Sequence, residues 1–260
     1  MAIRGEWAAI GNARGFVAKP AGPPPWPALI VVHAVIGIDE HIERLAEGFA
    51  ADGYCAVVPD IYANDPGYKQ HRHEHIEMAA HIGPDLAKYE AALAKESPET
   101  RAAVIKAREW MSGRPGHTYI DTIRAAYDHL HGRRDIRAIG AIGFCMGGRI
   151  VGELAAAGAE MAAGIIHYGG PPKLDQVPKI VTPLEGHYAS TDTPITSKIP
   201  AFAAAMKAAG KEFSYYVYEA DHGFTLRGTK FPEAARLALE RSKAFLAARL
   251  HPAALAGAAE

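Results

Sequence analysis

The feature that most constrains the fold is an apolar run of ten residues, ALIVVHAVIG, at positions 28–37. The run is rich in β-branched side chains and lacks an alternation of polar and apolar residues, which is typical of a strand buried on both faces of a parallel sheet. An amphipathic pattern over 39–51 predicts a helix, and a second apolar strand is expected at 54–62. Because parallel strands need a crossover connection, this order indicates a right-handed βαβ unit.

The same alternation resumes towards the C-terminus. Further strands are expected at 138–144, 162–170, 179–189 and 213–220. Helices are expected at 119–130, 147–157, 197–209 and 232–250. A short hairpin is expected before the first apolar run, at 7–10 and 15–18. Alternation of this kind is typical of an α/β fold, in which a mostly parallel sheet lies between layers of helices.

Between residues 63 and 116 the alternation lapses. The segment is polar at its start, and its patterns predict three helices, at 71–82, 84–95 and 99–112. It is too short and too poor in large apolar residues to hold a core of its own, so we expect a helical insertion packed over the sheet edge, not a separate domain. The prediction is one domain over 1–250 with a frayed tail at 251–260.

Composition excludes several classes of partner. The 260 residues include 28 Lys and Arg against 29 Asp and Glu without a basic stripe, so neither nucleic acid nor an anionic membrane is expected as a partner. The N-terminus lacks the apolar core of a signal peptide, and the longest apolar run is too short to span a bilayer. Two cysteines, Cys55 and Cys145, fit a reducing compartment better than a disulfide scaffold. We expect a cytoplasmic monomer or homodimer.

The most informative motif is Gly143-Phe-Cys-Met-Gly147, which lies between an expected strand and an expected helix of small residues. It fits the nucleophile elbow, in which glycines two residues on either side of the nucleophile let the strand and helix backbones approach at a tight turn. Such a turn presents Cys145 at the carboxyl end of the sheet, above a helix N-terminus that favours a thiolate. Cys145 is therefore the candidate nucleophile, whereas Cys55, among Ala and Val in a strand, is expected to be a core residue.

An elbow nucleophile needs an orienting acid and then a histidine base later in the chain. His222, in the stretch EADHGF, follows the last expected strand, which is where the base must lie to reach the elbow. Asp192, in GHYASTDTP, follows the preceding strand and is the candidate acid. Asp175 precedes its strand and Asp221 adjoins the base, so neither is well placed to accept a hydrogen bond from the ring.

The oxyanion hole is expected to consist of two backbone N–H groups. One belongs to Met146, directly after the nucleophile, and the other to Val35, in the loop after the first apolar strand. Because the donors are backbone groups, the side chains carry almost no signal and this expectation depends on geometry. Together these features predict an α/β-hydrolase fold with a triad of Cys145, His222 and Asp192.

Four stretches closely resemble the dienelactone hydrolase family, the carboxymethylenebutenolidases. They are VVHAVIGIDEHIERLAEGFAADGYCAVVPDIY, GFCMGG, GHYASTDTP and YEADHGF, so the resemblance covers roughly residues 26–62 and 117–250. A cysteine at the elbow is unusual among α/β-hydrolases and makes the match specific. The resemblance implies hydrolysis of a small lactone or ester that carries a carboxylate, through an acyl-cysteine intermediate and without a metal or other cofactor.

The chain departs from this family near the expected site. The family commonly has a glutamate that helps to activate the cysteine where this sequence has Ala34. Its substrate-binding arginine falls on Leu226, and Arg227 next to it is a possible substitute. The candidates for the family's other carboxylate-binding arginine are Arg72, Arg101 and Arg108. Ala34 and Ile36, on either side of Val35, are also candidate substrate-binding residues.

Other interpretations stay open. His71-Arg-His-Glu-His75 spells the H-x-x-E-H pattern of zinc proteases, whose outer histidines would share one helix face, but no third ligand is marked, so a solvated or pocket-lining helix is the simpler interpretation. A thioesterase or acyl-transfer enzyme could use the same triad, and a non-catalytic ligand binder could keep the same fold. His33 and His187 are interpreted as hydrogen-bonded histidines near the site, and Tyr62 and Trp110 as core or acyl-pocket residues.

Overall fold

The computed structural model describes residues 3–82, 86–113, 119–226 and 228–251 of the chain. Its centre is an eight-stranded sheet in the order β1-β2-β4-β3-β5-β6-β7-β8. The strands are β1 (Glu6–Ile10), β2 (Ala13–Ala18), β3 (Trp26–Val32), β4 (Cys55–Pro59), β5 (Ile136–Phe144), β6 (Ala163–His167), β7 (Leu184–Ala189) and β8 (Phe213–Tyr218). β2 pairs antiparallel with β1 and β4, and the other neighbours pair in parallel. The predicted hairpin and mostly parallel sheet are confirmed.

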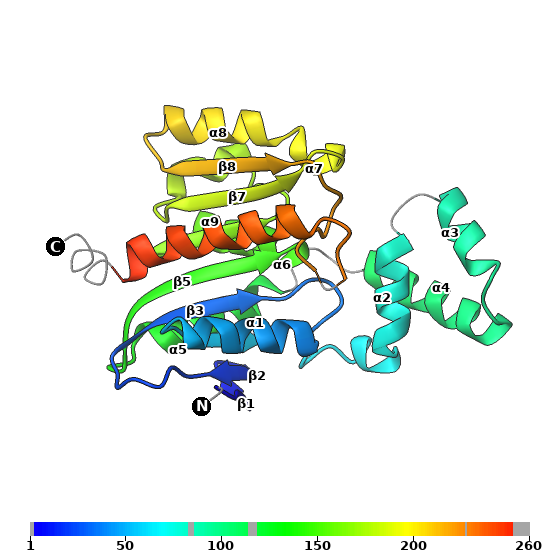
Figure 1. The fold of residues 1–260 in the computed structure, drawn as a ribbon, viewed down its shortest axis with the longest axis horizontal. Helices are drawn as coiled ribbons and strands as arrows, with labels where there is room; N and C mark the ends of the chain where they lie inside the picture. Colours follow the sequence, from blue (N-terminus) through cyan, green and yellow to red (C-terminus); the bar gives the residue numbers. More distant parts are fainter. Residues whose placement is uncertain (1–2, 83–85, 114–118, 227, 252–260) are drawn as a thin grey trace.

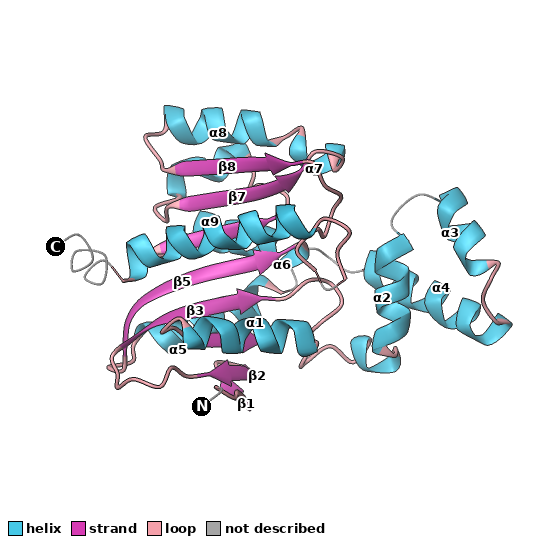
Figure 2. Ribbon diagram, viewed as in Figure 1, coloured by secondary structure: helices cyan, strands magenta, loops and turns pink. Residues whose placement is uncertain are grey.

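Helices cover both faces of this sheet (Figures 1 and 2). One face carries α1 (Glu40–Ala51) and α9 (Pro232–Leu250), and the other carries α5 (Ile120–His131), α6 (Met146–Ala156) and α8 (Ile199–Ala208). Two clusters of buried apolar side chains fill the space between the sheet and these two helical layers. This is the α/β-hydrolase architecture expected from the sequence. No helix in the described ranges has the length and apolar character needed to cross a membrane.

The strand that opens the parallel part of the sheet has the burial that its sequence predicts. Residues 28–32 of β3 are all 0% exposed, because helices cover both faces of the strand. The helix that follows begins at Glu40, and the side chain of Asp39 caps it by accepting a hydrogen bond of 2.9 Å from the N–H of Ile42. The first βαβ unit therefore forms where the sequence places it.

Strands β3, β4, β6, β7 and β8 are shorter than the sequence predicts, and for two of them the local structure shows why. β3 ends at Val32 rather than at residue 37, because residues 34–37 form a turn in which the Gly37 N–H donates to the Ala34 carbonyl at 3.1 Å. β7 begins at Leu184 rather than at residue 179, and residues 174–179 form a short 3₁₀ helix. Pro178 and Pro183 have no N–H to donate to a ladder, so the segment between them does not join the sheet.

The insertion consists of three helices, α2 (His73–Ile82), α3 (Leu86–Leu93) and α4 (Pro98–Ser112), preceded by a 3₁₀ turn at Tyr68–Gln70. They lie beyond the carboxyl ends of the strands, to the right of the sheet in Figure 1. The expectation that they pack over a sheet edge is therefore wrong. Ile76, Tyr89 and Val104 are buried among the three helices, and the insertion occupies the same end of the sheet as the residue after β5. The expected frayed tail lies outside the described residues from position 252 onwards.

Candidate active site

Cys145 occupies the one position between the end of β5 and the start of α6. Its backbone has φ 56° and ψ −115°, a conformation that costs energy for a residue with a Cβ. A Cβ on Gly143 would lie 2.2 Å from the carbonyl oxygen of Gly147, and a Cβ on Gly147 would lie 2.2 Å from that of Val32. Gly143 therefore lets β5 and α6 meet at this angle, and Gly147 lets the start of α6 approach the end of β3.

The structure brings the three predicted triad residues together. The Nε2 atom of His222 lies 3.1 Å from the sulfur of Cys145, and its Nδ1 atom lies 2.6 Å from Oδ2 of Asp192. Asp192 follows β7 and precedes the short helix α7 (Thr193–Thr196), while His222 lies in the loop after β8. Asp221 instead accepts a hydrogen bond of 2.8 Å from the Thr191 hydroxyl. The side chain of His222 is 40% exposed and that of Asp192 is 11% exposed, so the acid is the better shielded of the two.

These contacts raise the proton affinity of the histidine. Burial of the ring opposes protonation, but the hydrogen bonds to Asp192 and Cys145 outweigh it and raise the pKa of His222 to about 10. At neutral pH the imidazolium is then favoured, with one N–H directed at the carboxylate and the other at the sulfur. This arrangement places the proton on Nε2 of the imidazolium against the sulfur of Cys145.

A tyrosine that the sequence did not mark supports the loop of the candidate base. Tyr168 follows β6 with φ 40° and is fully buried. Its hydroxyl lies 2.6 Å from the hydroxyl of Thr225, and its ring contacts those of His222 and Phe224 at centroid distances of 5.1 and 5.5 Å. Burial raises the pKa of Tyr168, so the hydroxyl keeps its proton. Tyr168 therefore holds the loop that carries His222 through its contacts with Thr225, His222 and Phe224.

The two expected oxyanion donors belong to the start of α6 and to the turn after β3. Met146 is the first residue of α6, so its N–H has no acceptor within the helix. Val35 is half-buried and belongs to the turn 34–37, between β3 and α1. Ala34 and Ile36 are 3% and 6% exposed, and both belong to the apolar cluster against which Cys145 packs. Their proposed contact with substrate stays a prediction.

The candidate arginines of the insertion make hydrogen-bond, cation–π and ion-pair contacts with other residues of the insertion. The Nε of Arg101 donates to the carbonyl of Leu93 at 3.1 Å, and the guanidinium of Arg108 lies 3.9 Å from the centre of the Tyr89 ring. Both contacts join α4 to α3. Arg72 pairs with Glu74 at 3.0 Å, and Arg227 lies outside the described residues. Among the described arginines, these contacts do not single out one as a carboxylate-binding residue.

The zinc-protease pattern lacks the helical geometry that it requires. α2 begins at His73, so His71 precedes the helix and does not share a helical face with His75. The ring of His71 packs against Trp110 at 5.4 Å, and His75 lies 3.7 Å from the carboxylate of Glu74. Within the described ranges, no group of three His, Cys, Asp or Glu side chains is arranged to hold a metal ion.

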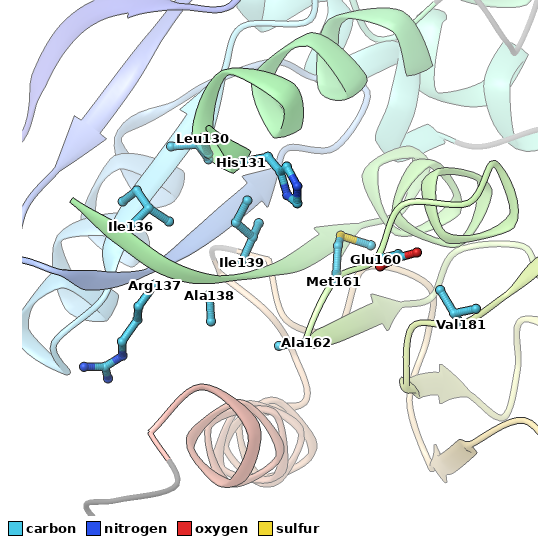
Figure 3. Close-up of a pocket in the computed structure, with 10 residues that line it drawn as sticks. All are labelled: Leu130, His131, Ile136, Arg137, Ala138, Ile139, Glu160, Met161, Ala162 and Val181. Carbon is cyan, nitrogen blue, oxygen red and sulfur yellow. The ribbon is translucent and has the colours of Figure 1, made fainter. Parts of the chain in front are cut away.

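A separate open pocket of about 580 Å³ lies at the opposite end of the sheet (Figure 3). Its walls come from the end of α5, the first residues of β5 and the loop before β6. Cys145 follows the other end of β5, so the pocket and the triad are separated by the length of that strand. Cys55, the other cysteine, is 5% exposed within β4, which is the core position expected for it.

The chain is similar to known proteins over almost its whole length. The model of the dienelactone hydrolase family matches residues 13–250. A protein of Saccharolobus solfataricus named "Putative carboxymethylenebutenolidase" is 28% identical over 246 residues, which are 90% of this chain and 93% of that protein. A protein of Azospirillum brasilense with the same name is 26% identical over 243 residues, with the same two coverages of 90% and 93%.

Solved structures show the same fold. A crystal structure described as a "Putative Dienelactone Hydrolase" from Klebsiella pneumoniae has a TM-score of 0.71 and 24% identity, with 95% of this chain and 99% of that chain covered. A dienelactone hydrolase from Anabaena variabilis has a TM-score of 0.64 and 14% identity, with coverages of 96% and 100%. At these identities, the structural likeness supports the architecture alone.

Proposed function

The chain belongs to the dienelactone hydrolase family, and on this premise we propose that it hydrolyses a small lactone or ester bearing a carboxylate, through an acyl-cysteine intermediate. The observation that carries the mechanism is the continuous chain from Cys145 Sγ through the two ring nitrogens of His222 to Asp192, with links of 3.1 and 2.6 Å. The class of substrate is supported by the family and by the names of the relatives.

The first half-reaction uses the resting pair of thiolate and imidazolium. The sulfur of Cys145 attacks the carbonyl carbon, and the negative charge moves to the carbonyl oxygen, where the N–H groups of Met146 and Val35 stabilise it. The intermediate collapses when the bond to the leaving oxygen breaks and that oxygen takes the Nε2 proton of His222. The products of this step are an alcohol and a thioester on Cys145; for a lactone they are one ring-opened chain.

The second half-reaction needs a neutral histidine, and formation of the thioester supplies it. The thiolate is one of the groups that raise the pKa of His222, so acylation removes this charge and lowers the proton affinity of the ring. His222 can then take a proton from water, which attacks the thioester carbonyl. Collapse of the second intermediate releases the carboxylic acid and regenerates the thiolate beside an imidazolium. Asp192 keeps the ring oriented through both steps.

The test is a panel of lactones and aryl esters assayed with the wild-type chain, Cys145→Ala and Cys55→Ala. We expect the wild-type chain to turn over at least one carboxylate-bearing member and Cys145→Ala to lose a factor of about 10⁴ or more in kcat. Cys55→Ala is the matched control, because it removes a thiol that is buried within β4, away from the turn that carries Cys145. Near wild-type turnover by Cys145→Ala would remove Cys145 from the role of nucleophile.

A further inference from the structure

The turn between β3 and α1 is held by three side-chain donors on three successive carbonyl groups. Nδ1 of His33 lies 2.7 Å from the carbonyl oxygen of Ala34. The Tyr62 hydroxyl donates to the carbonyl of Val35 at 2.8 Å, and the Tyr68 hydroxyl donates to that of Ile36 at 3.3 Å. Side chains commonly hydrogen-bond to backbone groups, and here three of them hold three successive carbonyls, which restrains the orientation of the turn.

Because a peptide group is planar, a hydrogen bond that holds its carbonyl also sets the direction of its N–H. In a trans peptide the carbonyl of one residue and the N–H of the next point in opposite directions. The hydrogen bond from His33 to the Ala34 carbonyl therefore directs the N–H of Val35 away from His33. The hydrogen bond from Tyr62 to the Val35 carbonyl acts in the same way on the N–H of the following residue. The three donors thus restrain the directions in which the turn presents its N–H groups.

The donors are themselves held rigidly. His33 is 0% exposed, and its Nε2 accepts from the N–H of Ile61 at 3.4 Å, which leaves Nδ1 as the protonated atom. Burial lowers the pKa of His33, so the ring stays neutral in this tautomer. Tyr62 is 1% exposed, its ring stacks on that of Tyr68 at 4.4 Å, and its hydroxyl lies 4.0 Å from the sulfur of Met146. The Tyr62 hydroxyl therefore lies between the two residues that are the proposed oxyanion donors.

The insertion is connected to this arrangement. Tyr68 belongs to the 3₁₀ turn at the start of the insertion, and Trp110 belongs to α4. The Trp110 ring packs against those of Tyr62 and Tyr68 at centroid distances of 5.5 and 5.6 Å. The helices beyond the carboxyl ends of the strands therefore support the two tyrosines whose hydroxyls hold the turn.

We infer that Tyr62, together with His33 and Tyr68, is a positioning residue of the oxyanion hole, and that the insertion contributes to catalysis by supporting it. The inference rests on the proposed function. Tyr62 does not touch substrate; its hydroxyl fixes the Val35–Ile36 peptide, which adjoins the Ala34–Val35 peptide that carries the proposed donor. Loss of the hydroxyl frees the Val35 carbonyl and leaves the Val35 N–H with the restraint from His33 alone, so the donor loses part of its fixed direction while Cys145 and His222 keep their contact.

The test compares Tyr62→Phe with Tyr127→Phe as a matched control. Tyr127 is also a buried tyrosine whose hydroxyl lies near a backbone carbonyl, that of Glu160 at 3.4 Å, but it is part of α5, near the start of β6. The measurements are kcat and KM on the best ester of the panel, and the rate at which iodoacetamide alkylates Cys145. Alkylation needs the thiolate but no oxyanion hole, so it reports on the Cys145–His222 pair alone.

We expect Tyr62→Phe to lower kcat about tenfold, less than the 10²–10³ seen when an oxyanion donor is removed directly, with KM and the alkylation rate within twofold of wild type. Tyr68→Phe, whose bond is longer, should show a smaller loss of the same kind, and it carries the test if Tyr62→Phe does not fold. An unchanged kcat in Tyr62→Phe, or equal losses of kcat and alkylation rate, would overturn the inference alone. A wild-type chain that hydrolyses nothing in the panel would overturn the proposed function and this inference with it.

Discussion

In two histidine–carboxylate pairs of this molecule, the pKa of the histidine is shifted in opposite directions. In the candidate site, Nδ1 of His222 lies 2.6 Å from Asp192, and the pKa of His222 is raised to about 10. In the interior between the sheet and α9, Nε2 of His187 lies 3.0 Å from Glu185, yet burial lowers the pKa of His187 in spite of this carboxylate. A carboxylate within hydrogen-bond distance is therefore not enough to make a histidine basic.

The surroundings of the two rings explain the difference. The side chain of His187 is 0% exposed, stacks on the ring of His167 at 4.7 Å and has Arg241 near enough to disfavour a second positive charge. Its Nδ1 lies 2.9 Å from the hydroxyl of Tyr218, a neutral group. The ring of His222 is 40% exposed and has a second partner, the Cys145 sulfur, that can itself become negative. Solvent access and a second acidic partner separate a candidate catalyst from a structural histidine.

The most direct test of this comparison is to replace each carboxylate with the corresponding amide. We expect Asp192→Asn to lower kcat by about 10³ to 10⁴, because the amide can hold the ring in the wrong tautomer and cannot stabilise the imidazolium. Glu185→Gln is the matched control, and it should leave kcat within about threefold while lowering the free energy of unfolding by about 1–3 kcal/mol, the cost of a disturbed buried polar group. Steady-state kinetics and urea unfolding on both variants make the measurement.

Equal kinetic losses in the two variants would contradict the comparison, since they would show that the buried pair contributes to catalysis. An unaffected kcat in Asp192→Asn would remove Asp192 from its proposed role. Asp221 is the next carboxylate to consider in that event, and its hydrogen bond of 2.8 Å from the Thr191 hydroxyl would have to break for it to reach the ring.

The second prediction concerns the thiol beside the basic histidine. Because the pKa of His222 is raised to about 10, the imidazolium persists through neutral pH with its Nε2 proton directed at the Cys145 sulfur. The rate of iodoacetamide inactivation should therefore reach a plateau below pH 8. In His222→Ala the plateau should be lost, and the rate at pH 6.5 should fall about tenfold or more.

A wild-type rate that keeps climbing past pH 8.5, with no dependence on His222, would show that the thiol rests unactivated. That result bears on Ala34, where the family commonly has an activating glutamate. Ala34 is 3% exposed and belongs to the apolar cluster against which Cys145 packs, and its methyl side chain holds no proton acceptor. In that case Ala34→Glu should raise turnover, whereas beside a preformed ion pair it should do little or slow it.

The sequence was sufficient where function depends on local pattern. The spacing of Gly143, Cys145 and Gly147 predicts the elbow because the glycines of this motif allow close backbone approaches, that of Gly143 to Gly147 within the motif and that of Gly147 to Val32 in the neighbouring strand. Chain order and the position after a strand similarly predict where His222 and Asp192 lie, since the carboxyl ends of parallel strands lie together at one end of the sheet. The mostly parallel sheet follows from the long apolar run at 28–37 and the alternation after it.

The sequence was insufficient where ordinary side chains meet across the fold. Tyr168 supports the His222 loop through Thr225, 57 residues away along the chain, and Tyr62 reaches Val35 across 27 residues. A tyrosine after a strand carries no mark of such a contact. The position of the insertion was also missed, because helical periodicity determines neither the direction in which a segment leaves the sheet nor the face that it covers.

The smallest expected effect is on acid stability, and it extends the comparison to the other buried histidines. Burial lowers the pKa values of His33, His167 and His187, that of His167 to well below 6.5. The unfolded chain binds a proton at each of these positions as pH falls through about 6.5, and the folded chain does not. The free energy of unfolding should therefore fall below that pH, by up to about 1.4 kcal/mol per pH unit for each histidine. His222 acts in the opposite sense, because its raised pKa gives stability that is present below 6.5 and lost as pH rises towards about 10.

His167→Gln isolates one of these contributions. Nε2 of His167 lies 3.0 Å from the hydroxyl of Ser242, and the amide of glutamine can replace that contact with a group that does not titrate. We expect the dependence of the unfolding free energy on pH between 7 and 5 to become shallower by up to about 1.4 kcal/mol per unit, the equivalent of one proton. His131→Gln, at an exposed position, is the matched control and should leave the slope unchanged. The slope is measured by urea titrations at pH 7, 6 and 5. If both variants kept the wild-type slope, His167 would not be a buried neutral histidine. The contrast between the histidines of the interior and His222 of the candidate site would then no longer include His167.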